Sequence, residues 1–182
     1  ILAVFDKKKL IFDFHHLSSS NTTFIDKEFE ENKKIFTNFK DYNNFFKKLN
    51  IIIDQELRKN LIEKKFNEIL TKKNIKIEKN TKLLDEVVDL TDQPNVLLCE
   101  FDRKFLNVPK EILIITMQNH QKYFPTFDNK GNITNEFLVV TNKQDKKGFI
   151  KLGNERVVEA RLSDAEFFWF KDKSQNLVKK VS

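Results

Sequence analysis

Residues 122–142, KYFPTFDNKGNITNEFLVVTN, predict a β-hairpin at the centre of the chain. Two largely apolar segments, Lys122–Phe127 and Glu136–Asn142, flank the turn sequence Asp128-Asn129-Lys130-Gly131. Aspartate, asparagine and glycine favour tight turns, and apolar runs bounded by such residues are typical of paired strands. Because a hairpin joins antiparallel strands, we expect a sheet with at least one antiparallel pair.

Helices and further strands are predicted around this hairpin from apolar periodicity and capping residues. The predicted helices cover residues 40–48, 54–73 (capped by Asp54), 81–91, 109–119 (opened by Pro109) and 155–171. The other predicted strands cover residues 1–5, 9–14, 50–53, 75–78 and 96–101, with a loop at 18–23 and a weak pattern over 26–38. This order predicts an α+β fold, with mixed or antiparallel strands and packed helices. We expect residues 1–182 to form one such region, with subdivisions at 1–53, 54–92 and 93–182.

Composition excludes several classes of protein. Of 182 residues, 40% are hydrophobic and 33% are charged, which is unlike disordered or collagen-like chains. No apolar run approaches the length of about 18 residues that a membrane-spanning helix needs. The single cysteine, Cys99, argues for a reducing compartment, so we expect a cytoplasmic protein. Because the sequence starts at Ile1 with no leader, we also expect no signal peptide and a piece of a longer protein.

The net charge of +6 arises from 33 lysines and arginines against 27 acidic residues. Such an excess can mark a nucleic-acid-binding surface. Only four of the basic residues are arginine, and lysine, asparagine, isoleucine and phenylalanine are the residues that an AT-rich genome enriches. On composition alone, we therefore favour solvated surface lysines over a dedicated nucleic-acid surface.

Motifs for catalysis or metal binding are absent from the sequence. It has no glycine-rich phosphate loop, no dinucleotide fingerprint and no Gly-x-Ser-x-Gly elbow. His15 and His16 would point to opposite faces of a strand, and Cys99 lies in an apolar strand. His120 shares a helical face with apolar residues, which predicts a half-buried histidine. We therefore predict no metal site, no cofactor and no catalytic residue in this region.

Two polar segments contain candidate RNA contacts. In residues 116–125, Lys122 could contact a phosphate and Tyr123 could stack on a base. The alternative is a packed turn with Tyr123 and Phe124 in the core. The second segment, residues 153–169, adds Asn154 and Arg156 as RNA-binding candidates.

The second segment also predicts structural contacts along one helix. Arg161 lies three residues before Asp164, a spacing that suits an ion pair. Arg156 lies about 140° around the helix from Arg161 and is the freer group for a phosphate. Phe167 and Phe170 lie away from the apolar stripe of this helix, so we expect them to be interface residues that pack against residues outside this chain.

Both segments contain ordered motifs with distinct spacing. They read TM..HQKYFP at Thr116–Pro125 and GNE.V...RL.DA.FF at Gly153–Phe168, with LL.EV from Leu83 and F...FL.VP at Phe101–Pro109 upstream. These motifs resemble the beta subunit family of the bacterial heterotetrameric glycyl-tRNA synthetase, with the strong match over about residues 81–172. Two positions depart from the family: residues 20–25 replace a pattern like Gly-His-Arg-Phe, and Leu152 stands where arginine often precedes the glycine.

The resemblance implies a partner and a division of labour. Two beta subunits would assemble with two alpha subunits, which carry the class II active site and use ATP and Mg²⁺ to activate glycine. The beta subunit would supply most of the recognition of tRNA(Gly), with no membrane involved. As a looser analogy, the fold would be similar to the B3/B4 domain of phenylalanyl-tRNA synthetase beta chains.

Three functions follow as hypotheses. The first is a non-catalytic module that binds tRNA(Gly) or supports assembly with the alpha subunit and the rest of the beta subunit. The second is an editing-like hydrolase pocket built from Thr116, Asn119, His120 and Asn154. The third is a purely structural scaffold that docks the alpha subunit, for which Phe167 and Phe170 are the interface candidates.

Overall fold

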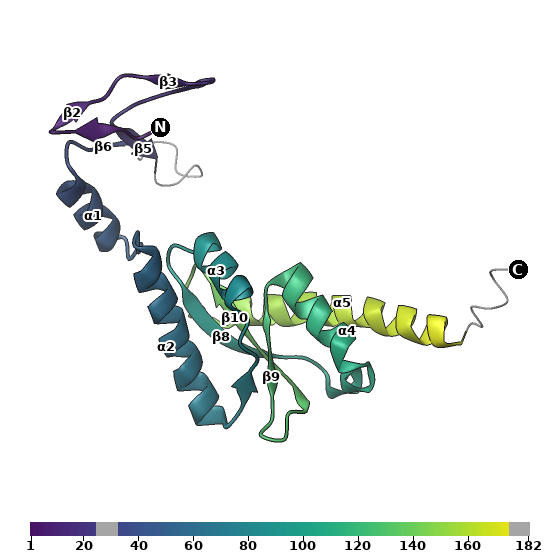
Figure 1. The fold of residues 1–182 in the computed structure, drawn as a ribbon. Helices are drawn as coiled ribbons and strands as arrows, with labels where there is room; N and C mark the ends of the chain where they lie inside the picture. Colours follow the sequence, from purple (N-terminus) through teal and green to yellow (C-terminus); the bar gives the residue numbers. More distant parts are fainter. Residues whose placement is uncertain (25–32, 175–182) are drawn as a thin grey trace, which may run out of the picture. The chain divides into compact units, whose positions relative to one another are not determined.

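The computed structural model describes residues 1–24 and 33–174. The chain divides into two compact units, Ile1–Ile53 and Asp54–Ser182, and each has its own strands. Both clusters of buried apolar side chains lie in the second unit. Helices and antiparallel strands occur in both units (Figure 1), so the predicted α+β class is confirmed. Within the described residues, no helix combines the length and apolar character that a membrane span requires.

The first unit consists of short antiparallel strand pairs and one helix. The pairs are β1 (Val4–Phe5) with β2 (Lys8–Lys9), β3 (Asp13–Phe14) with β4 (Leu17–Ser18), and β5 (Thr22–Phe24) with β6 (Lys33–Ile35). Helix α1 (Phe39–Lys48) begins after Asn38, whose side-chain oxygen accepts a hydrogen bond from the backbone N–H of Asp41. The buried ring of Phe36 packs edge-on against Tyr42 and Phe45 of this helix.

Three predictions for this unit are wrong. The strand expected over 9–14 is interrupted, because β2 ends at Lys9 and β3 begins only at Asp13. No strand forms over residues 50–53, because Asn50 has a left-handed φ of 59° that ends the turn after α1. The loop expected at 18–23 contains the end of β4 and the start of β5. Part of the weak pattern over 26–38, residues 26–32, lies outside the described residues.

The second unit is built on a four-stranded antiparallel sheet with the strand order β7-β9-β10-β8. These strands are β7 (Lys76–Ile77), β8 (Asn95–Glu100), β9 (Phe124–Phe127) and β10 (Ile133–Thr141). The predicted hairpin forms the two central strands, and Oδ1 of Asp128 accepts hydrogen bonds from the N–H groups of Lys130 and Asn132 across its turn. Hydrogen bonds from Asn132 lower the pKa of Asp128, so this turn is stabilised by a carboxylate.

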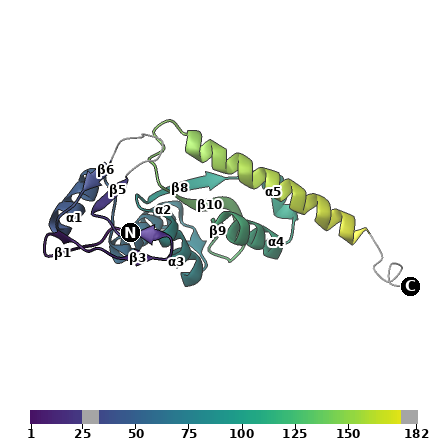
Figure 2. The same cartoon turned by 90° about the horizontal axis from the view of Figure 1, so that it is seen from above.

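Helices cover both faces of this sheet. One face packs against α2 (Gln55–Lys73) and α3 (Thr81–Leu90); the other packs against η1 (Arg103–Asn107), α4 (Lys110–Ile115), η2 (Thr116–His120) and α5 (Phe149–Lys173). Figure 2 shows α5 running along one side of the sheet. The alternation of β10 explains the two layers, since Leu138 packs under α2 and α3 whereas Phe137 and Val139 pack toward α5.

Two helices of this unit differ from the prediction. The helix expected over 109–119 is α4 followed by a π-helical turn, η2, and the last helix begins at Phe149 rather than Glu155. The start of α5 is stabilised by Asp145, whose carboxylate accepts hydrogen bonds from the N–H groups of Ile150 at 3.2 Å and Lys151 at 2.7 Å. These backbone bonds lower the pKa of Asp145.

Candidate functional site

The two motif segments meet at a hydrogen bond between Tyr123 and Asn154. Tyr123 is 6% exposed, its ring stacks on Phe137 with centroids 5.0 Å apart, and its hydroxyl donates to Oδ1 of Asn154 at 2.6 Å. The amide Nδ2 of Asn154 donates in turn to the carbonyl oxygen of Ile150. Neither side chain is free for RNA, because Tyr123 lies in the core and both polar groups of Asn154 are engaged. The alternative of a packed turn, with Tyr123 and Phe124 buried, is the arrangement found.

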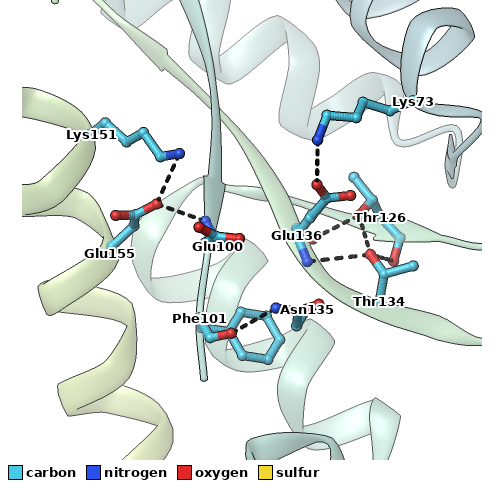
Figure 3. Close-up of polar contacts among 9 residues, drawn as sticks. All are labelled: Lys73, Glu100, Phe101, Thr126, Thr134, Asn135, Glu136, Lys151 and Glu155. Atoms are coloured by element: carbon cyan, nitrogen blue, oxygen red, sulfur yellow. Dashed lines mark hydrogen bonds and ion pairs between the residues drawn. The ribbon is translucent and has the colours of Figure 1, made fainter. Parts of the chain in front are cut away.

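Two further residues of α5 attach it to the edge of the sheet. An oxygen of Glu155 accepts a hydrogen bond from the N–H of Glu100 at 2.9 Å, and Glu159 accepts one from the N–H of Asp102 at 3.2 Å. Figure 3 shows Glu155 reaching the end of β8, with Lys151 beside it at 3.5 Å. Strand β8 is an edge strand, so these carboxylates satisfy backbone donors that the sheet leaves unpaired. The GNE motif therefore positions a helix.

On the other side of β8, β10 carries a second polar cluster, also drawn in Figure 3. The hydroxyl of Thr126 donates to the carbonyl oxygen of Glu136 at 2.7 Å and contacts that of Thr134. The carboxylate of Glu136 pairs with Lys73 of α2 at 3.1 Å. The pairing of β10 with β9 shifts register between Ile133 and Phe137, which forms a β-bulge. The contacts of Thr126, Thr134 and Glu136 lie at this bulge and stabilise it.

Lys122 is held by an ion pair with α3. Its Nζ lies 2.8 Å from Oε1 of Glu86, and its backbone has a left-handed φ of 59°. An ammonium group paired in this way is less available to a phosphate. The prediction that Lys122 contacts RNA receives no support from this arrangement.

Arg156 lies on the outward side of α5. It is exposed, and no hydrogen bond or ion pair of the described residues uses its guanidinium group. Phe149, seven residues earlier and therefore on the same face, is 70% exposed, and the unpaired lysines Lys146 and Lys147 precede it. We call Lys146, Lys147, Phe149 and Arg156 the outer face of α5; the two lysines belong to the loop just before the helix, which begins at Phe149. Sequence reasoning missed Phe149 because it started the helix at Glu155, and it gave the two lysines no role.

The far end of α5 is exposed and aromatic. Phe167 is 61% exposed and Phe170 is 48% exposed. Among the ion pairs of residues 1–24 and 33–174, none joins Arg161 to Asp164, so the predicted pair is not formed. Both of those side chains are exposed, where an ion pair would gain little free energy.

The residues proposed for an editing pocket differ in exposure and in their contacts. Thr116 is buried, Asn119 and His120 are exposed, and Asn154 is bound to Tyr123. His120 was expected to be half-buried; the π-helical turn η2 inserts an extra residue per turn and rotates it away from the core.

Cys99 is fully buried in β8, as its apolar strand predicted. Burial, with the nearby charge of Glu155, raises the pKa of its thiol to about 12, so it stays protonated. Within the residues described, no group of three or more histidine, cysteine, aspartate or glutamate side chains could hold a metal ion.

A pocket that the sequence did not indicate lies between α2, β7 and the start of α3. Its volume is about 720 Å³. Phe66, Leu84 and Phe124 contribute apolar walls, and Asn67 and Asn74 contribute side-chain amides. Most of its lining comes from the continuous stretch 63–84, to which the hairpin adds Phe124 and Asn129.

Comparison with known proteins connects these motifs to one family. The sequence profile described as "Glycyl-tRNA synthetase beta subunit" matches residues 1–182. The chain belongs to the glycyl-tRNA synthetase beta subunit family. It is 37% identical over 178 residues to the glycine–tRNA ligase beta subunit of Rickettsia akari, a match that covers 97% of this chain and 27% of that protein. The resemblance inferred from the motifs is thereby confirmed.

Two other bacteria contribute similar members of the beta subunit family. The protein of the same name from Thermodesulfovibrio yellowstonii is 36% identical over 178 residues, covering 97% of this chain and 26% of the relative. That from Dictyoglomus thermophilum is 44% identical over 139 residues, covering 76% of this chain and 20% of the relative. The chain thus spans about a quarter of the length of these relatives and belongs to an aminoacyl-tRNA synthetase family.

Proposed function

We propose that this chain is a non-catalytic part of a glycine–tRNA ligase that supports recognition of tRNA(Gly) and assembly of the enzyme. Membership of the beta subunit family supports this role. An alpha subunit, in a heterotetramer of two alpha and two beta subunits, would carry the active site with its ATP and Mg²⁺. The complex would act in the cytoplasm to attach glycine to tRNA.

The outer face of α5 is the observation that carries the tRNA-binding role. Arg156 and the lysines at 146 and 147 are cations without ion-pair partners in the described residues, and Phe149 lies among them with its ring in solvent. Unpaired cations neutralise phosphates, and an exposed aromatic ring offers a surface on which an unpaired base can stack. Exposed phenylalanines are common in this chain, so the position of Phe149 beside unpaired cations, rather than its exposure, supports a nucleic-acid contact.

The scaffold role rests on a different part of α5. The aromatic rings of Phe167 and Phe170 are exposed near the end of the described helix. An exposed apolar patch of this kind is typical of a protein interface. It supports docking to the alpha subunit or to the rest of the beta subunit, alongside a tRNA contact at the opposite end of the helix. The editing alternative has no comparable support, because Thr116 is buried and the carboxamide of Asn154 is bonded to Tyr123 and Ile150.

Filter binding of tRNA(Gly) to the intact protein over a salt series tests the tRNA-binding role. The Arg156→Ala variant is expected to bind more weakly and to reduce the slope of log affinity against log salt by about one, because one phosphate contact is lost. The matched control is Arg161→Ala, which removes an exposed arginine from another face of the same helix. If both variants bind like the wild type at every salt concentration, the outer face of α5 is not an RNA interface.

A further inference from the structure

The pocket between α2, β7 and the start of α3 has an apolar interior. Phe66 of α2 and Phe124 of β9 meet edge-to-face there with centroids 4.8 Å apart, and both are almost fully buried. Leu84 of α3 closes the same wall. The volume of about 720 Å³ falls within the range of ligand-binding cavities and is far larger than a packing void that holds one water molecule.

Exposed side-chain amides without hydrogen-bond partners in the described residues lie around this pocket. In the described residues, no hydrogen bond uses the side chains of Asn67, Asn74 or Asn129, although all three line the pocket. Asn80, which also lines it, behaves differently: its Oδ1 accepts from the N–H of Leu83 and its Nδ2 donates to Gln118. Three of the pocket's amides therefore retain both donor and acceptor capacity for a ligand.

The charges around the pocket are balanced. Two lysines, Lys76 and Lys79, and two glutamates, Glu63 and Glu78, line it, so the lining has no net charge. Such a lining does not attract a phosphate into the interior. Both lysines are exposed and have no ion-pair partner in the part of the chain that the structure describes, so they can contact anions at the rim.

We propose that this pocket binds an unpaired nucleobase of tRNA(Gly), with the flanking phosphates against Lys76 and Lys79. A nucleobase is planar and apolar on its faces, which suits the half-buried side chains of Leu70, Ile75 and Ile77 that line the pocket. Its edges carry donors and acceptors that asparagine amides can pair with, as unpaired RNA bases are usually read. This inference rests on the proposed tRNA-binding function and names a second contact, separate from the outer face of α5.

Filling the pocket tests this inference. In the intact protein, Asn67→Trp places a large side chain from α2 into the pocket, and Asn67→Ala together with Asn129→Ala removes two amides without adding bulk. Each is expected to weaken binding of tRNA(Gly) about tenfold, the usual effect of losing one base contact. Asn60→Trp is the matched control, because it introduces the same side chain on the same helix outside this pocket.

A panel of tRNA(Gly) molecules, each with one unpaired nucleotide made abasic, then identifies the bound base. The wild type is expected to bind one of these abasic tRNAs about tenfold more weakly than intact tRNA. The Asn67→Trp variant is expected to bind that abasic tRNA and intact tRNA equally, because the contact that the base makes is already lost in the variant. Circular dichroism checks that every variant is folded.

The outcomes separate this inference from the proposed function. If Arg156→Ala weakens binding and the pocket variants bind tRNA normally, the nucleobase pocket is overturned and the tRNA-binding role stands. If neither set of variants changes binding, both are overturned. Normal tRNA binding together with loss of subunit assembly in Asn67→Trp would assign the pocket to a protein segment instead.

Discussion

The hydroxyl of Tyr123 donates a hydrogen bond to Oδ1 of Asn154 across 31 positions of the sequence, at 2.6 Å. Burial raises the pKa of Tyr123 to about 12, so the hydroxyl remains a donor at neutral pH. The carboxamide of Asn154 is oriented by its own bond to the carbonyl oxygen of Ile150 at 2.7 Å. The most distinctive motif residues of the chain therefore attach α5 to the sheet.

Replacing Tyr123 with phenylalanine tests this attachment. Loss of the hydroxyl leaves Oδ1 of Asn154 without its donor, so the free energy of unfolding of the second unit should fall by about 1 kcal/mol. The fluorescence of Trp169, the single tryptophan, reports unfolding of α5 in urea. The other tyrosine, Tyr42, belongs to the first unit, and Tyr42→Phe should leave this transition unchanged. Equal midpoints for both variants would contradict the assignment.

Glu155 should matter for stability more than other acidic residues of α5. Its carboxylate accepts the N–H of Glu100 at the sheet edge, and hydrogen bonds to charged acceptors contribute about 1.5–3 kcal/mol. Partial exposure of Glu155 reduces this hydrogen-bond contribution, so Glu155→Ala is expected to lower the free energy of unfolding by about 1 kcal/mol. Glu166→Ala, on the same helix and without a hydrogen bond in the described residues, serves as control. Urea unfolding followed at Trp169 compares the two.

The predictions from sequence succeeded where the deciding signals are local. The hairpin turn lies within four residues, and α2 begins after Asp54, whose side chain accepts from the N–H of Leu57 at 3.0 Å. The turn and the helix cap both depend on residues that are close together in the sequence. The start of α5 was missed because Gly153 suggested a break, whereas glycine inside a helix costs only about 1 kcal/mol and the cap from Asp145 offsets it.

The candidate site was harder to predict because its partners are remote. An aromatic residue after a polar turn fits either a stacking surface or a core, and only the distant Phe137 and Asn154 decide that Tyr123 is buried. His120 was misplaced for a geometric reason. A π-helical turn changes the residue spacing, so faces calculated at 100° per residue no longer hold beyond it.

The buried thiol of Cys99 should make stability fall at high pH. Its pKa is raised from 9.0 to about 12, so above pH 9 the unfolded chain loses a proton that the folded chain keeps. The stabilising contribution is therefore complete below pH 9 and is lost as the pH rises toward 12. Cys99→Ala should show a smaller decline in urea midpoint between pH 8 and pH 10 than the wild type. Parallel declines would show that the thiol does not titrate differently in the two states.

Asp145 should make α5 sensitive to acid. Its pKa is lowered by the N–H groups of Lys151 and Ile150, so its contribution is present above the ordinary carboxyl pKa of 3.8 and is lost as the pH falls through the lower folded value. Asp145→Ala should lower the thermal midpoint at pH 7 and differ less from the wild type near pH 3. Asp164→Ala, an exposed aspartate of α5 without a hydrogen bond in the described residues, is the control. An equal deficit at both pH values would argue against a capping carboxylate.

Substitutions at the two ends of α5 should affect two different functions, tRNA(Gly) binding and association with the alpha subunit. Phe149 is 70% exposed among cations, whereas Phe167 and Phe170 are exposed at the other end. Phe149→Asp should weaken tRNA(Gly) binding by roughly five- to tenfold and leave association with the alpha subunit intact, because a carboxylate repels phosphate and cannot stack. Phe167→Asp with Phe170→Asp should do the reverse, since burying two carboxylates in an apolar interface is costly. Size-exclusion chromatography measures association with the alpha subunit, and filter binding measures tRNA(Gly) binding on the same preparations. Loss of both activities in either variant would show that one surface serves both partners.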